Sequence, residues 1–224
     1  MAITTLTTKA TESSAYGNSF SRYTNAMVSL ICVAISIVLL SSAEAAQIKW
    51  DQETVRTVLS QEIQRIETIA KHPIVVNAVS VQNQKHLSQT IIQQRDKVWV
   101  NSGDNTPFKQ AMLSSPASQY LANIATQNPS FTELLLIDEQ GANVAVYPLT
   151  SDYWQGDEMK WQSIFIEKRS SYVGSMEYDQ SSGLNSIQIS LPIQENGKPI
   201  GVIVVGVKLS HILARQLRQP AQAD

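Results

Sequence analysis

Residues 186–209, SIQISLPIQENGKPIGVIVVGVKL, decide the fold of this chain. The first part, 186–194, alternates apolar and polar residues, which is the period of a half-buried β-strand. The Asn-Gly pair after it, Asn196-Gly197, favours a tight hairpin turn. Residues 199–209 are a nearly continuous apolar run, typical of a fully buried strand. We therefore predict a long β-hairpin at the centre of a sheet. Four side chains of the first strand would share its buried face: Ile187, Ile189, Leu191 and Ile193.

Three further segments extend this sheet. FTELLLID (131–138) is apolar and suits a buried strand. A turn at Glu139–Asn143 leads into a second short strand at 144–147, and a third is predicted at 172–178. Strands that follow one another through short turns form antiparallel sheets.

Helices are predicted around these strands. Residues 51–71 carry apolar side chains at spacings of three and four, and Pro73 ends or kinks that helix. Weaker or shorter helical patterns cover 84–100, 117–127, 157–168 and 210–218. The loop between the second and third helices spans Ser102–Pro107. The expected fold class is α+β, with helices that cover the sheet. The apolar positions of the first helix are Val55, Leu59, Ile63, Ile66 and Ile69.

A targeting leader precedes this domain. Residues 28–40, VSLICVAISIVLL, form a short apolar run, preceded by basic residues and followed by small ones. This is the pattern of a secretory signal peptide, and the run is shorter than the roughly 20 residues of a membrane span. We interpret residues 1–46 as a signal peptide or an uncleaved signal anchor in the inner membrane. Both alternatives place the residues after 47 outside the cytoplasm, in the periplasm or beyond. The domain then covers 47–218, with a helical part at 51–128, a sheet part at 129–209 and a tail at 219–224.

Composition excludes several classes of function. The formal charge of −2 offers no basic surface, so we expect no nucleic-acid partner. The single cysteine, Cys32, lies in the leader, and the three histidines lack a metal-binding spacing. No G-x-S-x-G nucleophile motif is present. We expect no catalytic residue, no metal and no cofactor, and hence no enzyme.

The stretch TSDYWQGDEMKW (150–161) concentrates aromatic and acidic residues between a strand and a helix. Rings stack on cations and carboxylates pair with them, so this stretch suits a small ligand with an amine group. A second interpretation stays open. Trp154 and Trp161 would then pack the sheet against its loop, and Asp157 would cap the following helix.

Four segments together resemble the extracytoplasmic Cache (PDC) sensor domains, which are PAS-like modules of bacterial receptors. The segments are GANVAVYPLTSDYWQGDEMKW (141–161), EYDQSSG (177–183), ISLPI (189–193) and GKPIGVIVVGV (197–207). The resemblance is strongest over residues 129–209. It implies a five-stranded antiparallel PAS-like sheet with a long amino-terminal helix and a helical cap. It also implies a ligand-binding side made of Tyr147, Tyr153, Trp154, Asp157, Trp161, Tyr178 and Asp179.

One departure from the family concerns the ligand. Members that bind amino acids hold the ligand carboxylate with an arginine close to a tryptophan and a tyrosine. Here Met159-Lys160-Trp161 offers Lys160, a point charge without the bidentate fork of arginine.

The sequence thus predicts a stand-alone sensor module that binds an amine, an amino acid or a carboxylate. Asp157 and Asp179 would hold the ligand cation, and Trp154 and Trp161 its apolar part. The signal would pass to an unknown membrane partner. The helix at 51–71 could pair with its copy in a homodimer, or could use its apolar face on its own sheet. The alternative function is a structural or interaction protein that binds no small molecule.

Overall fold

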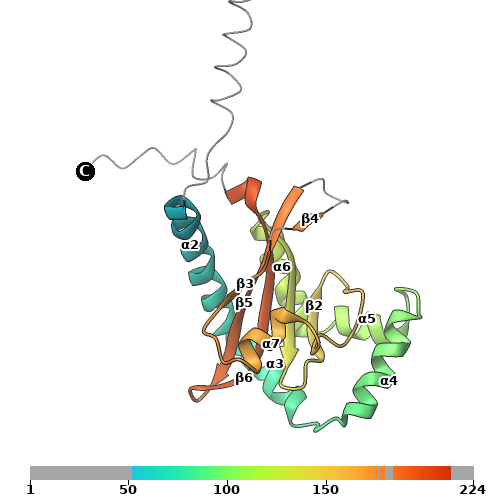
Figure 1. The fold of residues 1–224 in the computed structure, drawn as a ribbon. Coiled ribbons are helices and arrows are strands. Elements are labelled where there is room, and N and C mark those ends of the chain that lie inside the picture. Colours follow the sequence, from blue (N-terminus) through green and yellow to red (C-terminus); the bar gives the residue numbers. More distant parts are fainter. Residues whose placement is uncertain (1–51, 176, 180–183, 213–224) are drawn as a thin grey trace, which may run out of the picture. The chain divides into compact units, whose positions relative to one another are not determined.

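The computed structural model describes residues 52–175, 177–179 and 184–212 (Figure 1). The described residues from Glu53 onward group into one compact unit. The predicted leader, the predicted tail and the end of the predicted closing helix lie outside the described residues. Within the described part, no helix is both long enough and apolar enough to cross a membrane.

The described strands form one antiparallel sheet in the order β2-β1-β6-β5-β3. The short β4 pairs with β5 as well, so β3 and β4 together form one edge of a sheet that is five strands wide. The predicted α+β fold with a PAS-like antiparallel sheet is therefore confirmed. The strands are β1 (Phe131–Asp138), β2 (Asn143–Tyr147), β3 (Tyr172–Val173), β4 (Glu177–Asp179), β5 (Leu184–Glu195) and β6 (Lys198–Lys208).

The central hairpin forms as the sequence predicts. β5 and β6 pair from Ser186↔Lys208 to Glu195↔Lys198. The turn residues Asn196 and Gly197 have φ values of 50° and 75°, the left-handed conformation that an Asn-Gly hairpin turn requires.

The third predicted strand is interrupted. β3 pairs Val173 with Ile189, while β4 pairs Glu177 with Ser186, so the register shifts between them. At the break the amide of Gly174 still donates to the carbonyl of Gln188, at 2.8 Å. The prediction of one strand over 172–178 was wrong in this respect, since a bulge divides it into two short strands.

Both faces of the sheet are buried. One face packs against α2 (Gln52–Ala70), α3 (Pro73–Asn83) and α6 (Pro116–Gln127). The other face, which includes Leu135, Ile137 and Val204, packs against α7 (Met159–Phe165). Burial of each such aliphatic side chain is worth about 1.5–3 kcal/mol, so the two cores hold the layers together. In Figure 1 the long helix α2 runs alongside the strands, next to β5.

Helix boundaries follow the capping residues. Pro73 does end the first helix, and it also begins the next, with the His72 side chain accepting from the Ile74 amide. α4 (Gln89–Val100) and α5 (Pro107–Leu113) begin after Ser88 and Thr106, whose hydroxyls accept from backbone amides of the first turn. Helix α5 was not predicted, because it is short and its sequence resembles the end of a loop.

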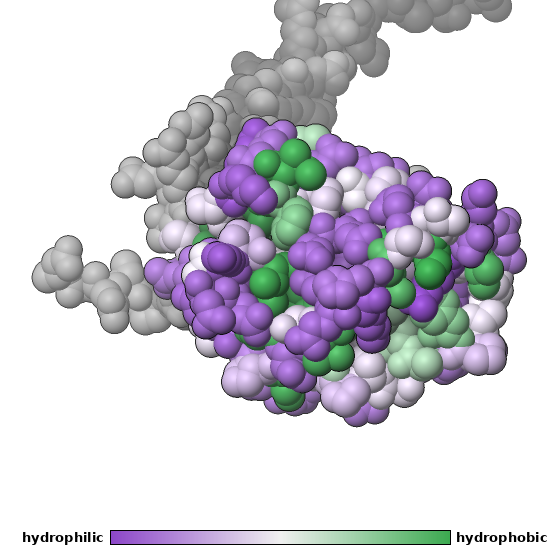
Figure 2. All heavy atoms as spheres, turned by 90° about the horizontal axis from the view of Figure 1, so that it is seen from below, coloured by the Kyte–Doolittle hydropathy of each residue, from purple (hydrophilic) through white to green (hydrophobic). Residues whose placement is uncertain are grey.

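The described part of α2 uses its apolar side chains on its own sheet. Ile66, Ile69 and Ala70 are buried in the core, and Leu59 and Ile63 pack against it. This is one of the two uses that the sequence leaves open for this helix. Helix α4 carries three exposed large apolar residues, Ile91, Val98 and Val100. The face seen in Figure 2 is mostly hydrophilic.

Candidate functional site

The loop that carries the aromatic-acidic stretch returns alongside the β1–β2 turn. Trp154 forms an isolated antiparallel bridge with Ala142. The backbone N–H of Asn143 donates to the Tyr153 carbonyl at 3.0 Å, and the backbone N–H of Gln155 donates to the Gly141 carbonyl at 2.7 Å. These bonds hold the loop against the β1–β2 turn.

A carboxylate from helix α4 fixes the same loop from the other side. Oδ1 of Asp96 accepts the backbone amides of Tyr153 at 2.8 Å and Trp154 at 2.9 Å. A carboxylate that accepts two backbone N–H groups makes strong, charge-assisted bonds. Helix α4 therefore sets the position of the Tyr153 side chain.

Three rings from different elements meet beneath this loop, and we call them the aromatic cluster: Trp99, Phe108 and Tyr153. Their centroids are 5.3–5.9 Å apart, at angles that suit edge-to-face and tilted contacts. Trp99 is fully buried, and its indole N–H donates to the Thr150 carbonyl at 2.9 Å. The rings pack against one another, with Trp99 and Tyr153 buried and Phe108 partly exposed.

A polar cluster adjoins these rings: Gln82, Arg95, Asp138 and the Tyr153 hydroxyl. Asp138 is 3% exposed at the end of β1. Its Oδ1 accepts hydrogen bonds from the backbone N–H groups of Gln140 and Ala142, both at 2.9 Å. The side-chain amide of Gln82 donates to its Oδ2 at 3.4 Å. One carboxylate oxygen is thus well bonded within the turn, and the other has a long contact.

The titration behaviour of this cluster reflects its burial. Desolvation raises the pKa of Asp138, and the hydrogen bonds from Ala142, Gln140 and Gln82 oppose that rise. Burial likewise raises the pKa of Tyr153, against a hydrogen bond and the positive charge of Arg95. Arg95 itself is half-buried, with its guanidinium carbon 5.7 Å from the centroid of the Phe108 ring. The cluster therefore contains both signs of charge beside three rings.

The structure brings two of the predicted site residues to this place. Tyr153 belongs to both clusters, and Trp154 lies half-buried beside them, with its indole N–H donating to the Gln140 carbonyl at 2.9 Å. Trp161 packs in the separate core beneath α7, stacked on Phe165 at 5.2 Å. Its indole N–H nevertheless donates to the Asp138 carbonyl at 3.0 Å, which places it next to the polar cluster.

The other predicted residues lie elsewhere. Asp157 is exposed, and Glu158 rather than Asp157 precedes the first turn of α7, so the predicted start of that helix at residue 157 was wrong. Tyr147 packs with the core on the opposite face of the sheet. Tyr178 and Asp179 belong to β4, at the far side of the sheet order from β2.

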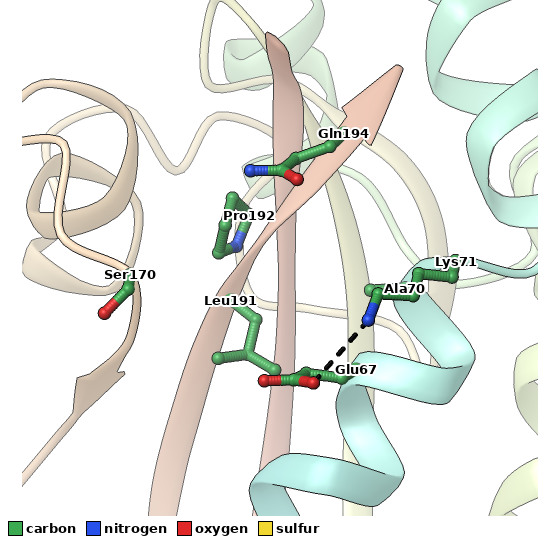
Figure 3. A pocket seen from close by; sticks show the side chains of 7 residues that line it. All are labelled: Glu67, Ala70, Lys71, Ser170, Leu191, Pro192 and Gln194. Atoms are coloured by element: carbon green, nitrogen blue, oxygen red, sulfur yellow. Dashed lines mark ion pairs between the residues drawn. The ribbon is translucent and has the colours of Figure 1, made fainter. Parts of the chain in front are cut away.

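A surface hollow of about 230 Å³ lies away from these clusters, between α2 and β5 (Figure 3). Glu67 and Lys71 line it and form an ion pair of 3.7 Å, and Leu191, Pro192 and Gln194 face it from the strand. Its described lining contains none of the predicted site residues. Among residues 52–175, 177–179 and 184–212, no group of three or more His, Cys, Asp or Glu residues is placed to hold a metal ion.

Comparisons with known proteins yield fold-level likenesses. No family model and no curated protein matches the chain. Similar solved structures include the ligand-binding domain of the Pseudomonas aeruginosa PAO1 amino acid chemoreceptor PctC in complex with GABA, at 16% identity and a TM-score of 0.34. The alignment covers 69% of this chain and 63% of that one.

Two further structures are similar at the same level. The sensor domain of the V. cholerae histidine kinase DctB has 16% identity, a TM-score of 0.34 and coverage of 75% of this chain and 62% of that one. The sensory domain of the Campylobacter jejuni chemoreceptor Tlp3 with isoleucine bound has 14% identity, a TM-score of 0.35 and coverage of 76% and 69%. This chain spans slightly less than two thirds of the first two domains. At such identities function has to be argued from the site itself.

Proposed function

We propose that this chain is an extracytoplasmic sensor module that binds a small molecule and signals through a membrane partner. The observation that carries the proposal is the buried polar cluster of Asp138, Gln82, Arg95 and Tyr153 against the aromatic cluster. Ionisable groups with perturbed pKa values beside apolar rings are typical of functional sites. The sequence resemblance to Cache domains and the leader pattern support the same function and location.

The chemistry of the cluster favours a ligand with both a cationic and an anionic group, of the amino acid class. The second oxygen of Asp138 has only a long contact of 3.4 Å with the side-chain amide of Gln82, and a ligand ammonium would be a stronger donor. Arg95 offers the planar fork that suits a carboxylate, and which the segment around Trp161 lacks. The rings of Trp99, Phe108 and Tyr153 would take the apolar part of the ligand.

The mechanism is driven by occupancy. Because the rings pack closely, ligand entry requires the loop of Thr150–Asp157 to shift from its present position. A ligand that binds one loop arrangement more tightly than the other shifts the population between them. Gln82 lies in the last turn of α3, and α3 follows α2 directly, so a change at the cluster can pass to the long helix.

Thermal-shift titration of the full chain tests this function. At 100 times its dissociation constant a true ligand stabilises the protein by about 2.7 kcal/mol. The panel should comprise amino acids, amines and carboxylates, and zwitterions should give the largest shifts. Asp138→Asn and Arg95→Met should each remove the response, while the exposed control Arg169→Met should keep it. A response that survives both cluster variants contradicts the proposed site.

A second function is favoured by one observation. Trp99 is fully buried and Tyr153 is 1% exposed, as expected of a core that stays packed. On that basis the chain would be a structural or interaction protein with a Cache-like fold and no ligand. A complete panel without any shift, together with slow hydrogen exchange of the Tyr153 and Trp154 amides, would favour this alternative.

A further inference from the structure

Helix α4 is attached to the domain by few of its side chains. Of its 12 residues, Ile92 and Trp99 are buried, whereas Ile91, Val98 and Val100 are exposed. The two buried side chains belong to a small core of their own, separate from the two cores that pack on the sheet. Figure 1 accordingly shows α4 away from β5 and β6. Elements with few buried apolar contacts open at a lower free-energy cost than the main core, so we expect α4 to separate more readily than the sheet unfolds.

Asp96 joins α4 to the loop of Thr150–Asp157, and we call this junction the α4–loop contact. Oδ1 of Asp96 accepts the backbone N–H groups of Tyr153 and Trp154 at 2.8 and 2.9 Å. The indole N–H of Trp99 adds a bond of 2.9 Å to the Thr150 carbonyl. Hydrogen bonds to an ionised acceptor are roughly twice as strong as neutral ones, so a large share of this contact depends on one carboxylate.

The β1–β2 turn holds the same loop from its other side. The indole N–H of Trp154 donates to the Gln140 carbonyl at 2.9 Å. The backbone N–H of Gln155 donates to the Gly141 carbonyl at 2.7 Å. Neither bond involves α4, so both can persist when α4 and the loop separate.

Exposed connectors at both ends of α4 permit such a movement. Residues 84–86 precede the helix and are exposed, and His86 has a φ of 45°, a conformation uncommon in residues other than glycine. After the helix, Gly103 is exposed and has open space where a Cβ would lie. Hinges are a few loop or element-terminal residues of this kind, which absorb changes in φ and ψ.

We propose that the domain opens at the α4–loop contact and that Asp96 sets how often it opens. In the open state α4 moves away with Arg95 and Trp99, while Tyr153 and Trp154 stay with the β1–β2 turn. The loop thereby changes its position relative to α4 and keeps its position relative to the turn.

This movement has a consequence for the ligand, which rests on the proposed function. Asp138, which would hold the ligand cation, stays on β1, whereas Arg95, which would hold the anion, moves with α4. A zwitterion bonds to both residues in the closed state alone and therefore favours that state. Asp96 is then a positioning residue, because it sets the population of the closed state without contact to the ligand.

Hydrogen exchange of the indole N–H groups, measured by NMR on the full chain without ligand, tests the proposal. Trp99 reports on the α4–loop contact, and Trp154 on the contact between the loop and the turn, each through a bond of 2.9 Å to a backbone carbonyl. Asp96→Ala should speed exchange at Trp99 at least about tenfold, because two charge-assisted bonds are lost. Exchange at Trp154, and at Trp161 in the core beneath α7, should stay close to the rates of the natural chain. Alanine is the best helix former, so weaker helix formation in α4 does not account for such a result.

Two further variants make the test specific. Lys97→Ala changes the next residue of the same helix, whose side chain is exposed, and should leave all three indole rates unchanged. Asp96→Asn keeps an acceptor oxygen and loses the charge, so it should speed exchange at Trp99 less than Asp96→Ala does. It serves as the test variant if Asp96→Ala does not fold. Backbone exchange in the β5–β6 hairpin monitors global unfolding and should not change.

The proposal is overturned if exchange at Trp99 and Trp154 speeds up to the same extent, because the loop would then leave the turn as well. It is also overturned if Asp96→Ala affects Trp99 no more than Lys97→Ala does. The measurement needs no ligand, so a thermal-shift panel without any response would remove the consequence for the ligand and leave the opening itself intact.

Discussion

Substitution of Trp99 by phenylalanine tests whether the aromatic cluster holds helix α4 and the loop of residues 150–157 in place. The indole N–H of Trp99 donates to the Thr150 carbonyl at 2.9 Å, and the ammonium of Lys109 lies 5.3 Å from the indole centroid. Phenylalanine keeps a ring in the cluster but loses the donor, part of the cation–π contact and part of the buried volume. Each loss can be assigned a magnitude.

A buried carbonyl left without its donor costs about 1–3 kcal/mol. The weakened cation–π contact adds about 0.5 kcal/mol, and the smaller ring leaves a void worth about 1 kcal/mol. Together these give a loss of about 3 kcal/mol in the free energy of unfolding. For a domain of this size, each kcal/mol lowers the melting temperature by roughly 2–4 °C, so a fall of about 9 °C is expected.

Urea unfolding followed by circular dichroism measures the loss, with the melting temperature as a second readout. Trp154→Phe is the matched control, since it also removes an indole donor, at 2.9 Å from the Gln140 carbonyl, but from a half-buried side chain. We expect the control to lose clearly less than Trp99→Phe. A Trp99→Phe variant within about 0.5 kcal/mol of the natural chain would refute the role assigned to the cluster.

Three further predictions concern stability. Burial raises the folded-state pKa of Asp138 above its unfolded value, so the folded state binds that proton more tightly and the stabilisation is lost as pH rises through the raised pKa. Urea titrations of Asp138→Asn and of the natural chain should therefore show the difference in the free energy of unfolding shifting in favour of the variant as pH rises from acid to neutral. A difference that does not change with pH would contradict this. Gly201→Ala should cost about 1–3 kcal/mol or more, because its Cβ would lie too close to the Ile137 carbonyl oxygen, whereas Gly103→Ala, with open space around it, should change the melting temperature little. Ser115→Ala removes the side-chain cap of α6, whose hydroxyl accepts the Ser118 amide at 3.1 Å, and should cost about 1 kcal/mol in the same urea assay; no loss would mean that solvent replaces the cap.

The sheet and the long helix were predictable because their signals are local. Alternation along residues 186–194 and the Asn-Gly turn specify the central hairpin without reference to the rest of the chain. The helix at 51–71 has its own apolar period, and its end at Pro73 follows from the missing N–H of proline. The break between β3 and β4 was not predictable in this way, since it depends on the register against β5.

The candidate site was predictable in part. The stretch of 150–161 marked the loop that carries Tyr153 and Trp154, both of which lie at the clusters. Arg95 and Gln82 were missed, because they reach Tyr153 through packing of helices far away in sequence. One local signal existed: Arg95 and Trp99 are four residues apart on α4, so they share one face of that helix.

Asp138 was missed for a different reason. It follows an apolar strand and precedes a Gly-containing turn, where an aspartate is usually explained by backbone bonds alone. The structure shows that it makes those bonds with one oxygen while the other faces Gln82. Two sets of contacts made by one side chain leave no separate mark in a sequence.

Because Asp138 bonds the β1–β2 turn and also contacts Gln82, substitutions at this position are restricted. Any replacement there disturbs both the turn between β1 and β2 and the polar cluster that contains Gln82, Arg95 and Tyr153. Arg95 and Phe108 sit on helices whose backbones do not depend on those side chains. Under the proposed function, relatives that bind other ligands should therefore differ first at Arg95 and Phe108, and should retain Asp138.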